Sequence, residues 1–307
     1  MPKVSVVVPV YYNEGSLPLL FIELQEIEES LLSTGMELEL IFVDDGSADN
    51  SLAELLKIKR QRPDTRVVKL TRNFGAVHAS KTGLQFVTGD CFLILAADLQ
   101  DPPELILTMV EKWKAGAKFI MATRTDRDDP VSSKIFSYIY YKLLQRLVIP
   151  NYPDGGYDMA LMDKAILPYL LNSSKNLYTP LLIYWLGFEP VVLPYKRRKR
   201  LHGRSRWTFN KKMTASIDAL FGFSYIPIRL ISSIGLLVSV ASFFYAIWII
   251  INGLLGRMEV RGFATIVTLI AFMQGMGIFM LGIIGEYIWR IFDEVNHRPE
   301  SVIDAIY

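Results

Sequence analysis

The sequence predicts a protein in two parts, a doubly wound α/β domain followed by two membrane-spanning helices. Three observations lead to this fold class. The 307 residues are 51% hydrophobic with a mean hydropathy of +0.27, which is too apolar for an ordinary soluble domain. Strand-like and helix-like patterns alternate over the first ~225 residues, as in α/β domains. Two long runs without charged residues follow, at 230–251 and 263–285.

The first part contains five β-branched or aromatic apolar runs that we expect to be strands, at residues 3–10, 38–44, 66–70, 91–97 and 118–122. Between them lie four stretches with helical periodicity, at residues 16–33, 51–60, 76–87 and 103–115. This alternation predicts a sheet with right-handed helical crossovers. Ligands of such sheets bind beyond the carboxyl ends of the strands, so the residues there are the first candidates for a site.

The two uncharged runs are 22 and 23 residues long. At ~1.5 Å per residue, each is long enough as a helix to cross ~30 Å of hydrocarbon. Buried core helices are the alternative, but two such runs separated only by residues 252–262 favour membrane spans. Lysines and arginines are concentrated at 196–212, before the first run, and Arg290, His297 and Arg298 follow the second. Both flanks are therefore expected on the cytoplasmic side.

Composition and motifs exclude several classes of protein. The net charge of +2 carries no nucleic-acid signal, and a single cysteine, Cys91, excludes a disulfide framework. The three histidines are too scattered to form a metal site. No glycine-rich dinucleotide motif or P-loop is present, which disfavours dinucleotide oxidoreductases and P-loop NTPases. The N-terminus has no basic-then-apolar leader, so no secretion signal is expected.

Polar side chains follow each expected strand. They are Tyr11, Asn13 and Glu14, then Asp44 and Asp45, then Arg72 and Asn73, then Asp98, Gln100 and Asp101, and finally Arg124 and Arg127. Each group alone could be ordinary turn chemistry, but their convergence on one sheet edge predicts a binding site. Without a phosphate-binding loop, a nucleotide diphosphate could be neutralised by a divalent cation on Asp98 and Gln100, together with nearby arginines.

Five segments, taken in order, resemble glycosyltransferase family 2. They are VPVYYNE at 8–14, VDDGS at 43–47, TRNFG at 71–75, ADLQDPPE at 97–104 and GIIGEYI at 282–288. Within this family the chain is similar to the polyprenyl-phosphate glycosyltransferases, which include bactoprenol glucosyltransferases and dolichol-phosphate mannose synthases. The resemblance implies a GT-A type, Rossmann-like catalytic domain. It also implies transfer of a sugar from a nucleotide-sugar to a lipid phosphate, with inversion at the anomeric carbon.

The resemblance also implies roles for individual residues. Asp98 and Asp158 would be catalytic, and Asp98 and Gln100 would bind Mg²⁺ or Mn²⁺. The nucleotide-sugar would contact Pro9, Tyr11, Glu14, Asp44, Asp45, Arg72, Ala97, Gln100 and Arg124. The acceptor phosphate or the diphosphate would contact Arg127, Arg200, Ser205 and Arg206. For Asp158 a surface ion pair is the alternative, and for the basic run 196–200 the alternative is topology-setting charge.

The sequence departs from the family pattern at three positions. Ala96 stands where the family usually has the first aspartate of D-x-D, so one carboxylate near the donor is missing. Ala160 replaces the arginine of the family's D-F-R motif, and Trp289 replaces a glycine after Glu-Tyr-Ile. The first two departures bear on metal dependence and donor identity. They also leave open a second function, that of a membrane-anchored sugar-nucleotide-binding or scaffold protein that has lost catalysis.

The expected organisation is a cytoplasmic catalytic domain at 1–208, an interfacial helix at 209–229, two spans at 230–285 and a cytoplasmic tail at 286–307. Residues 132–148 are a further candidate interfacial helix, with an ordinary surface or core helix as the alternative. We expect a protein of the bacterial plasma membrane that transfers glucose from UDP-glucose to undecaprenyl phosphate for cell-envelope glycan modification. GDP-mannose or a UDP-amino sugar is the alternative donor. The resemblance further implies a homo-oligomer, with a tetramer as one form.

Overall fold

The structure of the protein is a computed structural model. It describes residues 1–125, 138, 141–142, 144–146, 149, 152–153, 156–174, 179–198, 223–224, 226–255 and 262–307. The chain divides into two compact units. The first contains Met1–Ala219 together with Pro299–Tyr307, and the second contains Leu220–Arg298.

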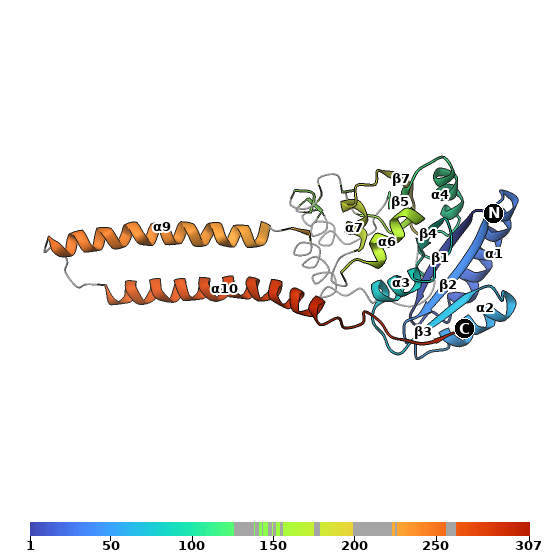
Figure 1. Ribbon diagram of the computed structural model, residues 1–307, viewed down its shortest axis with the longest axis horizontal. Helices are drawn as coiled ribbons and strands as arrows, with labels where there is room; N and C mark the ends of the chain where they lie inside the picture. Colours follow the sequence, from blue (N-terminus) through green and yellow to red (C-terminus); the bar gives the residue numbers. More distant parts are fainter. Residues whose placement is uncertain are drawn as a thin grey trace. The chain divides into compact units, whose positions relative to one another are not determined.

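The first unit is built on an eight-stranded sheet (Figure 1). The strands are β1 (Lys3–Val10), β2 (Glu37–Asp44), β3 (Arg66–Leu70), β4 (Cys91–Ile94), β5 (Phe119–Arg124), β6 (Met159–Asp163), β7 (Pro190–Tyr195) and β8 (Ile303–Ile306). Their order in the sheet is β7-β5-β6-β4-β1-β2-β3-β8. The β1–β2, β1–β4, β2–β3 and β5–β7 pairs are parallel, whereas β6 and β8 run antiparallel to their neighbours. The predicted α/β class and its five strands are confirmed.

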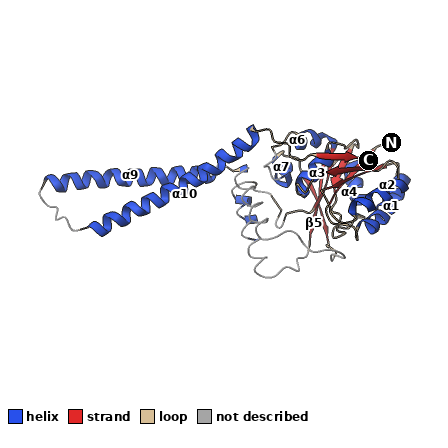
Figure 2. Ribbon diagram, turned by 90° about the horizontal axis from the view of Figure 1, so that it is seen from below, coloured by secondary structure: helices blue, strands red, loops and turns tan. Residues whose placement is uncertain are grey.

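Helices cover both faces of this sheet (Figure 2). They are α1 (Leu17–Ser33), α2 (Ser51–Gln61), α3 (Ala76–Leu84), α4 (Leu105–Lys114), the short 3₁₀ helix η1 (Lys164–Ile166), α6 (Leu167–Leu171) and α7 (Thr179–Trp185). Alternate residues of β1 divide between the two faces, since Val6 and Val8 join the core beneath α1 and α4. Val7 points the other way, and a Cβ atom at Gly83 of α3 would lie 2.4 Å from its Cγ1. Gly83 is therefore required where α3 lies against the sheet.

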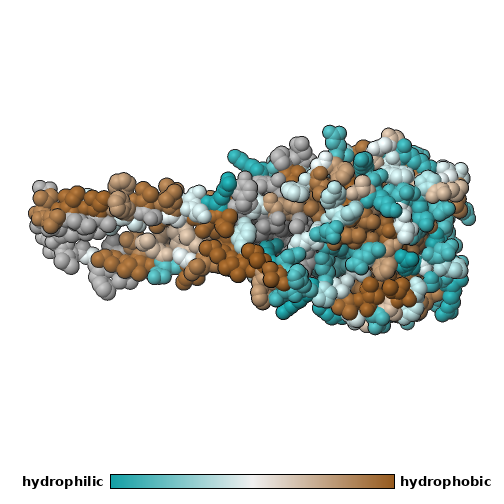
Figure 3. Space-filling view, viewed as in Figure 1, coloured by the Kyte–Doolittle hydropathy of each residue, from teal (hydrophilic) through white to brown (hydrophobic). Residues whose placement is uncertain are grey.

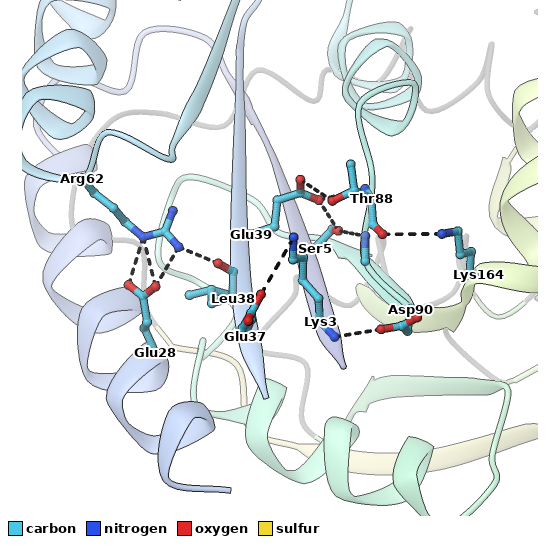
Figure 4. Close-up of polar contacts among 11 residues, drawn as sticks. Lys3, Ser5, Glu28, Glu37, Leu38, Glu39, Arg62, Thr88, Asp90 and Lys164 are labelled. Carbon is cyan, nitrogen blue, oxygen red and sulfur yellow. Dashed lines mark hydrogen bonds and ion pairs between the residues drawn. The ribbon is translucent and has the colours of Figure 1, made fainter. Parts of the chain in front are cut away.

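The amino end of the sheet is closed by polar side chains that bind one another (Figure 4). The Glu39 carboxylate accepts hydrogen bonds from Ser5 Oγ, Thr88 N and Thr88 Oγ1, at 2.5, 2.9 and 2.8 Å. Arg62 binds the Glu28 carboxylate through Nε and Nη2, and its Nη2 also donates to the Leu38 carbonyl oxygen. These groups satisfy each other's hydrogen-bonding capacity. We therefore assign this cluster of polar side chains to the stability of the fold and not to a ligand site.

Residues 299–307 belong to the first unit and contain its eighth strand, β8, which the sequence did not predict. β8 pairs with β3, and Lys69 Nζ lies 2.5 Å from Asp304 Oδ2. Before β8, Glu300 Oε1 lies 2.5 Å from Lys81 Nζ of α3, and the Ser301 and Thr82 hydroxyl oxygens are also 2.5 Å apart. Burial alone would raise the pKa of Glu300, but His78 and Lys81 outweigh it and lower the pKa. The expected tail at 286–307 thus ends as part of the sheet.

Replacing Glu300 by glutamine should lower the free energy of unfolding by about 1–3 kcal/mol, because Lys81 would remain without its carboxylate partner. The Lys81 side chain is only 13% exposed. Glu54→Gln is the matched control, since its partner Lys57 is 60% exposed and the loss should be below about 0.5 kcal/mol. Thermal unfolding of the detergent-solubilised protein compares the two variants. Equal decreases in the unfolding temperature of the two variants would show that the buried pair of Glu300 and Lys81 does not hold the C-terminal segment.

The second unit contains two long helices, α9 (Ile226–Leu254) and α10 (Phe263–Val295). Each includes a stretch long and apolar enough to cross a membrane, at Ile228–Tyr245 and Phe272–Val295. Only 6% of the first stretch and 0% of the second are buried, counted over the described residues. Much of the visible surface of these helices is hydrophobic (Figure 3). A core helix of a soluble protein would be mostly buried, so these helices resemble spans more closely than core helices.

The two helices lie side by side within this unit (Figures 1 and 2), where Met280 Cε would lie 3.8 Å from a Cβ atom at Gly235. Tyr287 of α10 donates a hydrogen bond to the Ser224 carbonyl oxygen, at 3.2 Å. The expected interfacial helix at 209–229 lies largely outside the described residues, and so does most of the candidate at 132–148.

Candidate active site

The carboxyl ends of the parallel strands bring the predicted polar residues to one edge of the sheet. Asp44 is the last residue of β2 and Arg124 the last of β5. β6 runs in the opposite direction, so Asp158, which directly precedes it, reaches the same edge. Tyr195 ends β7 beside Arg124, its register partner on β5. Residues separated by up to 151 positions in the chain therefore meet here.

Asp44 and Asp45 are both buried, but they have different surroundings. The Asp45 carboxylate accepts hydrogen bonds from Asn73 Nδ2, Phe74 N and Gly75 N, at 2.9, 2.7 and 2.9 Å. It therefore holds the loop after β3 in place. Asp44 Oδ1 accepts one long hydrogen bond, 3.3 Å, from Ser47 N. Its Oδ2 is a buried oxygen without a hydrogen-bond partner among the described residues.

The difference matters because an unpaired buried acceptor is costly unless a ligand supplies the donor. Burial raises the pKa of the Asp44 carboxyl, and its hydrogen bonds with Ser47 only partly oppose this effect. Burial also raises the pKa of Asp45, although the hydrogen bonds from the N–H groups of Phe74 and Gly75 act to lower it. Of this pair, Asp44 is the residue with capacity left for a ligand, whereas Asp45 is engaged in positioning a loop.

The loops after β1 and β2 are tied together around Asp44. Tyr12 N donates to Ser47 Oγ at 3.1 Å, and Asn50 N donates to Glu14 Oε2 at 2.9 Å. Tyr12 has a positive φ of 58°, a conformation that is uncommon for a residue other than glycine and that often marks functional loops. Gly46 is required in the same region, because its φ is +68° and a Cβ atom there would lie 2.5 Å from Arg72 C.

The segment after β4 alternates between the core and the accessible side of the site. Leu95, Ala97 and Leu99 are buried, whereas Ala96, Asp98 and Gln100 are partly exposed. Leu99 has a φ of 58°, and Gln100 N donates to Asp98 Oδ1 at 3.2 Å. Asp98 and Gln100 are therefore the partly exposed polar residues of this segment. Ala96, where the first aspartate of D-x-D would stand, is partly exposed as well.

These donors fit a divalent cation that also binds the substrate. Mg²⁺ is commonly held by one or two carboxylates plus substrate phosphates, and Asp98 with the Gln100 amide oxygen matches that requirement. Within the described part of the chain, no group of three or more His, Cys, Asp or Glu side chains could hold a metal ion by itself. The residues present thus fit a cation shared with a diphosphate and do not form a closed all-protein site.

Asp158 forms a partly buried ion pair with Arg124. Arg124 Nε and Nη2 donate to the two oxygens of the Asp158 carboxylate, whose side chain is 15% exposed. Tyr195 Oη lies 2.9 Å from Asp158 Oδ2 and 2.6 Å from Asp101 Oδ1. Arg197 Nε lies 3.2 Å from the same Asp101 oxygen. Two carboxylates, two guanidinium groups and one phenol thus form a connected network.

The network fixes the charge on Asp158. Burial alone would raise the pKa of this carboxyl, but the hydrogen bonds and charge of Arg124, with Arg197 and Tyr195, outweigh it and lower the pKa. The hydrogen bonds from Arg124 to Asp158 raise the pKa of the guanidinium. Asp158 is therefore held as an anion by Arg124. This is an ion pair, as the alternative interpretation supposed, but it is partly buried at the site and is not an exposed surface pair.

Comparison with known proteins identifies the family. Residues 5–171 match the family described as glycosyl transferase family 2, which is more than half of the chain. The chain belongs to glycosyltransferase family 2. It is a glycosyltransferase, as its relatives are also named.

A bactoprenol glucosyl transferase of Shigella phage SfV is 33% identical over 304 residues, covering 98% of each chain. The prophage bactoprenol glucosyl transferase homolog of Escherichia coli K12 is 31% identical over 307 residues, covering 99% of each chain. Among solved structures, glucosyl-3-phosphoglycerate synthase from Mycobacterium tuberculosis, in complex with Mn²⁺ and UDP-glucose, is 15% identical. It covers 75% of this chain and 78% of its own, with a TM-score of 0.49.

The structure of the glycosyltransferase brings most of the predicted site residues to one edge. Pro9, Tyr11, Glu14, Asp44, Asp45, Arg72, Ala97, Asp98, Gln100, Arg124 and Asp158 all lie at or just beyond the strand ends described above, or in the case of Asp158 just before a strand. Arg72 places its guanidinium over the Phe74 ring, 4.2 Å from the centroid. Arg127, Arg200, Ser205 and Arg206 lie outside the described residues, so their roles stay predictions.

Sequence reasoning missed Tyr195, whose hydroxyl joins Asp101 to Asp158. Its strand, β7, was not among the five expected strands, because prolines at 190 and 194 interrupt the apolar pattern. β7 lies at one edge of the sheet, where proline is tolerated. An aromatic hydroxyl at the end of the run PVVLPY, directly before the basic segment, was the available signal.

Proposed function

We propose that this glycosyltransferase transfers glucose from UDP-glucose to a polyprenyl phosphate in the bacterial plasma membrane, with inversion at the anomeric carbon. The observation that carries this proposal is the 33% identity, over nearly the whole chain, to a protein named bactoprenol glucosyl transferase. The relatives match both units, because 98% of the chain is covered. The two helices of the second unit, each apolar enough to span a bilayer, fit an acceptor that stays in lipid.

The chemistry requires stabilisation of a leaving group. An acceptor phosphate oxygen attacks the anomeric carbon, the bond from that carbon to the diphosphate breaks, and negative charge develops on the departing nucleoside diphosphate. Groups placed on that charge lower the barrier more than groups that bind the sugar equally in both states. Asp98 and Gln100 would hold the divalent cation, which when bound supplies positive charge to the diphosphate. Asp44 Oδ2 supports binding of the nucleoside, because it is a buried acceptor that needs a donor.

The acceptor needs no strong base, because a phosphomonoester has a second pKa of about 6 and is largely dianionic near neutral pH. Asp158 fits an orienting role for this reason, since Arg124 and Tyr195 already occupy its carboxylate. The lipid must remain in the bilayer, because moving it into water costs about 0.8 kcal/mol per CH₂ group. We therefore propose that α9 and α10 cross the membrane. The catalytic unit would lie on the cytoplasmic side, because lysines and arginines are concentrated before the first span.

The test uses the purified full-length chain in phospholipid nanodiscs that contain undecaprenyl phosphate. Labelled UDP-glucose, GDP-mannose and a UDP-amino sugar are each supplied with Mg²⁺ or Mn²⁺, and the lipid products are identified by mass. We expect a glucosyl-phospholipid whose formation stops with chelator. A glycolipid from another donor would correct the sugar only. No glycolipid from any donor would favour the sugar-nucleotide-binding scaffold suggested by Ala96 and Ala160.

Ala96→Asp should lower the metal concentration for half-maximal activity by about 3- to 10-fold, because an added carboxylate raises the ligand charge count of a cation site. Ala96 is partly exposed, like Asp98 and Gln100, and lies two residues before Asp98. Ala96→Asn is the matched control, with the same shape and no charge. Metal titration of product formation measures both variants, and an aspartate that behaves like the asparagine would remove position 96 from the cation's surroundings.

A further inference from the structure

The residues that leave β7 are attached to the segment that carries the candidate cation ligands. Tyr195 Oη donates toward Asp101 Oδ1 at 2.6 Å, and Arg197 Nε lies 3.2 Å from the same oxygen. Arg198 N donates to the Gln100 carbonyl oxygen at 2.9 Å. Three of four consecutive residues thus contact a loop that lies more than 90 positions earlier in the chain. We call Tyr195, Arg197 and Arg198 the β7 clamp.

The Arg198 side chain extends the attachment to two helices. Its Nη1 lies 2.9 Å from both carboxylate oxygens of Glu23 on α1. Its Nη2 lies 2.8 Å from both oxygens of Glu104, which directly precedes α4. One exposed ion pair contributes little, and Arg198 is 39% exposed. Two carboxylates on one planar guanidinium nevertheless fix its orientation, which a lysine could not reproduce.

Tyr195 connects the same loop to Asp158. Its hydroxyl oxygen lies 2.9 Å from Asp158 Oδ2 as well as 2.6 Å from Asp101 Oδ1. A phenol has a single hydrogen, which the two carboxylates must share. Because Asp101 is 4% exposed, solvent cannot easily replace that hydrogen bond. The Tyr195 hydroxyl group therefore connects the loop after β4 directly to the residue before β6.

We propose that the β7 clamp is a positioning device that holds Asp98 and Gln100 in place relative to Asp158, and that Arg198 acts through carboxylates of this chain and does not bind a phosphate. This inference rests on the proposed function, because it assigns the clamp to donor binding in that reaction. It changes the interpretation of the basic run 196–200, because the guanidinium of its third member, Arg198, is committed to Glu23 and Glu104. Arg197 pairs with Asp101 by charge, and its buried Nε has no hydrogen-bond partner among the described residues.

The inference predicts which kinetic constant changes. Loosening the loop that carries Asp98 and Gln100 should weaken use of the nucleotide-sugar. In Arg198→Ala, which removes no contact of Asp158, use of the lipid phosphate should stay unaltered. Tyr195→Phe should raise KM for the nucleotide-sugar, or lower kcat/KM for it, by about 10-fold to 100-fold, the loss expected for a hydrogen bond to a charged group. Tyr184→Phe is the matched control, since its hydroxyl lies 3.5 Å from Met121 Sδ.

Substitutions of Glu23 and Glu104, the carboxylate partners of Arg198, distinguish a positioning role of Arg198 from phosphate binding. Removing both partners with the double variant Glu23→Gln/Glu104→Gln should reproduce the change in donor KM caused by Arg198→Ala. If Arg198 instead binds the acceptor phosphate, Arg198→Ala raises the acceptor KM, whereas the double variant releases the guanidinium and leaves that KM the same or lower. Arg198→Lys keeps the charge but not the two bidentate contacts, so it should resemble Arg198→Ala and not the wild type.

Hydrogen–deuterium exchange of the full chain tests the clamp without relying on turnover. Residues 98–104 should exchange faster in Tyr195→Phe and in Arg198→Ala than in Tyr184→Phe and the wild type. Unchanged exchange and unchanged donor kinetics in both clamp variants would overturn the inference while the wild type still makes glycolipid. If the wild type makes none, the proposed function fails, and faster exchange of residues 98–104 would still support the clamp as a structural attachment.

Discussion

Asp98→Asn should lower kcat by at least about 100-fold, as expected when a charged group is removed from the site of developing charge. Asparagine has nearly the shape of aspartate, and its side-chain oxygen can still accept the hydrogen bond that Gln100 N donates to Asp98. The segment after β4 should therefore keep its conformation and lose only the charge. Product formation from the nucleotide-sugar and the lipid phosphate, at saturating metal, measures the effect.

The matched control is Asp64→Asn, an exposed aspartate in the turn between α2 and β3, at the amino end of the sheet. It should leave kcat within about 2-fold of the wild type, because exposed substitutions away from a site have small effects. Both variants should be recovered from membranes in similar amounts. Near-normal turnover of the Asp98→Asn protein would refute the role of this carboxylate in holding the cation.

Asp158→Asn should be the most destabilising of the proposed variants, by roughly 2–4 kcal/mol, because it leaves the Arg124 guanidinium partly buried without its carboxylate. Arg124 and Asp158 are 27% and 15% exposed, which places the cost below that of a fully buried pair. The same change should lower kcat by about 10-fold to 100-fold through misplaced groups at the site, less than Asp98→Asn. Thermal unfolding and product formation give the two values.

The pH dependence of stability gives a second test of this pair. The pKa of Asp158 is lowered in the folded protein, so its contribution to stability is complete above its ordinary pKa of about 4. That contribution is lost as the pH falls through the lowered folded-state pKa. The gap in stability between the wild type and Asp158→Asn should therefore narrow in acid. Asp163→Asn, at the other end of β6, is the control, since Asp163 accepts hydrogen bonds from Trp113 Nε1 and Ala165 N. A gap that does not depend on pH would contradict the assigned ion pair.

The sequence predicts those strands whose own residues form a recognisable apolar pattern. β1, β2 and β3 are rich in valine, isoleucine and leucine and end in polar turns, so their alternation is visible without tertiary information. β6 has the composition MALMD, with no β-branched residue, and is a strand because it pairs with β4 and β5. β8 has four residues and is a strand because β3 offers an unpaired edge.

The site follows the same division. Asp44 and Asp98 could be predicted because each ends or follows a strand whose direction is fixed by the local pattern. The sequence could not predict that Asp45 positions a loop while Asp44 keeps capacity for a ligand. That difference depends on which of the two carboxylates accepts hydrogen bonds from the N–H groups of residues 73–75. The contacts of Tyr195 with Asp101 span 94 positions of sequence, and their partners are set by the order of strands in the sheet.

The late position of β8 has a consequence for biosynthesis. Its hydrogen-bonding partner β3 ends at Leu70, whereas β8 is made only after both apolar helices have been synthesised. At about 5–20 residues per second, the backbone edge of β3 stays open for roughly 10–50 s during translation and membrane insertion. An open strand edge is a template for wrong pairing between nascent chains. Cells that overproduce this enzyme should therefore depend on chaperones that shield that edge until the chain is complete.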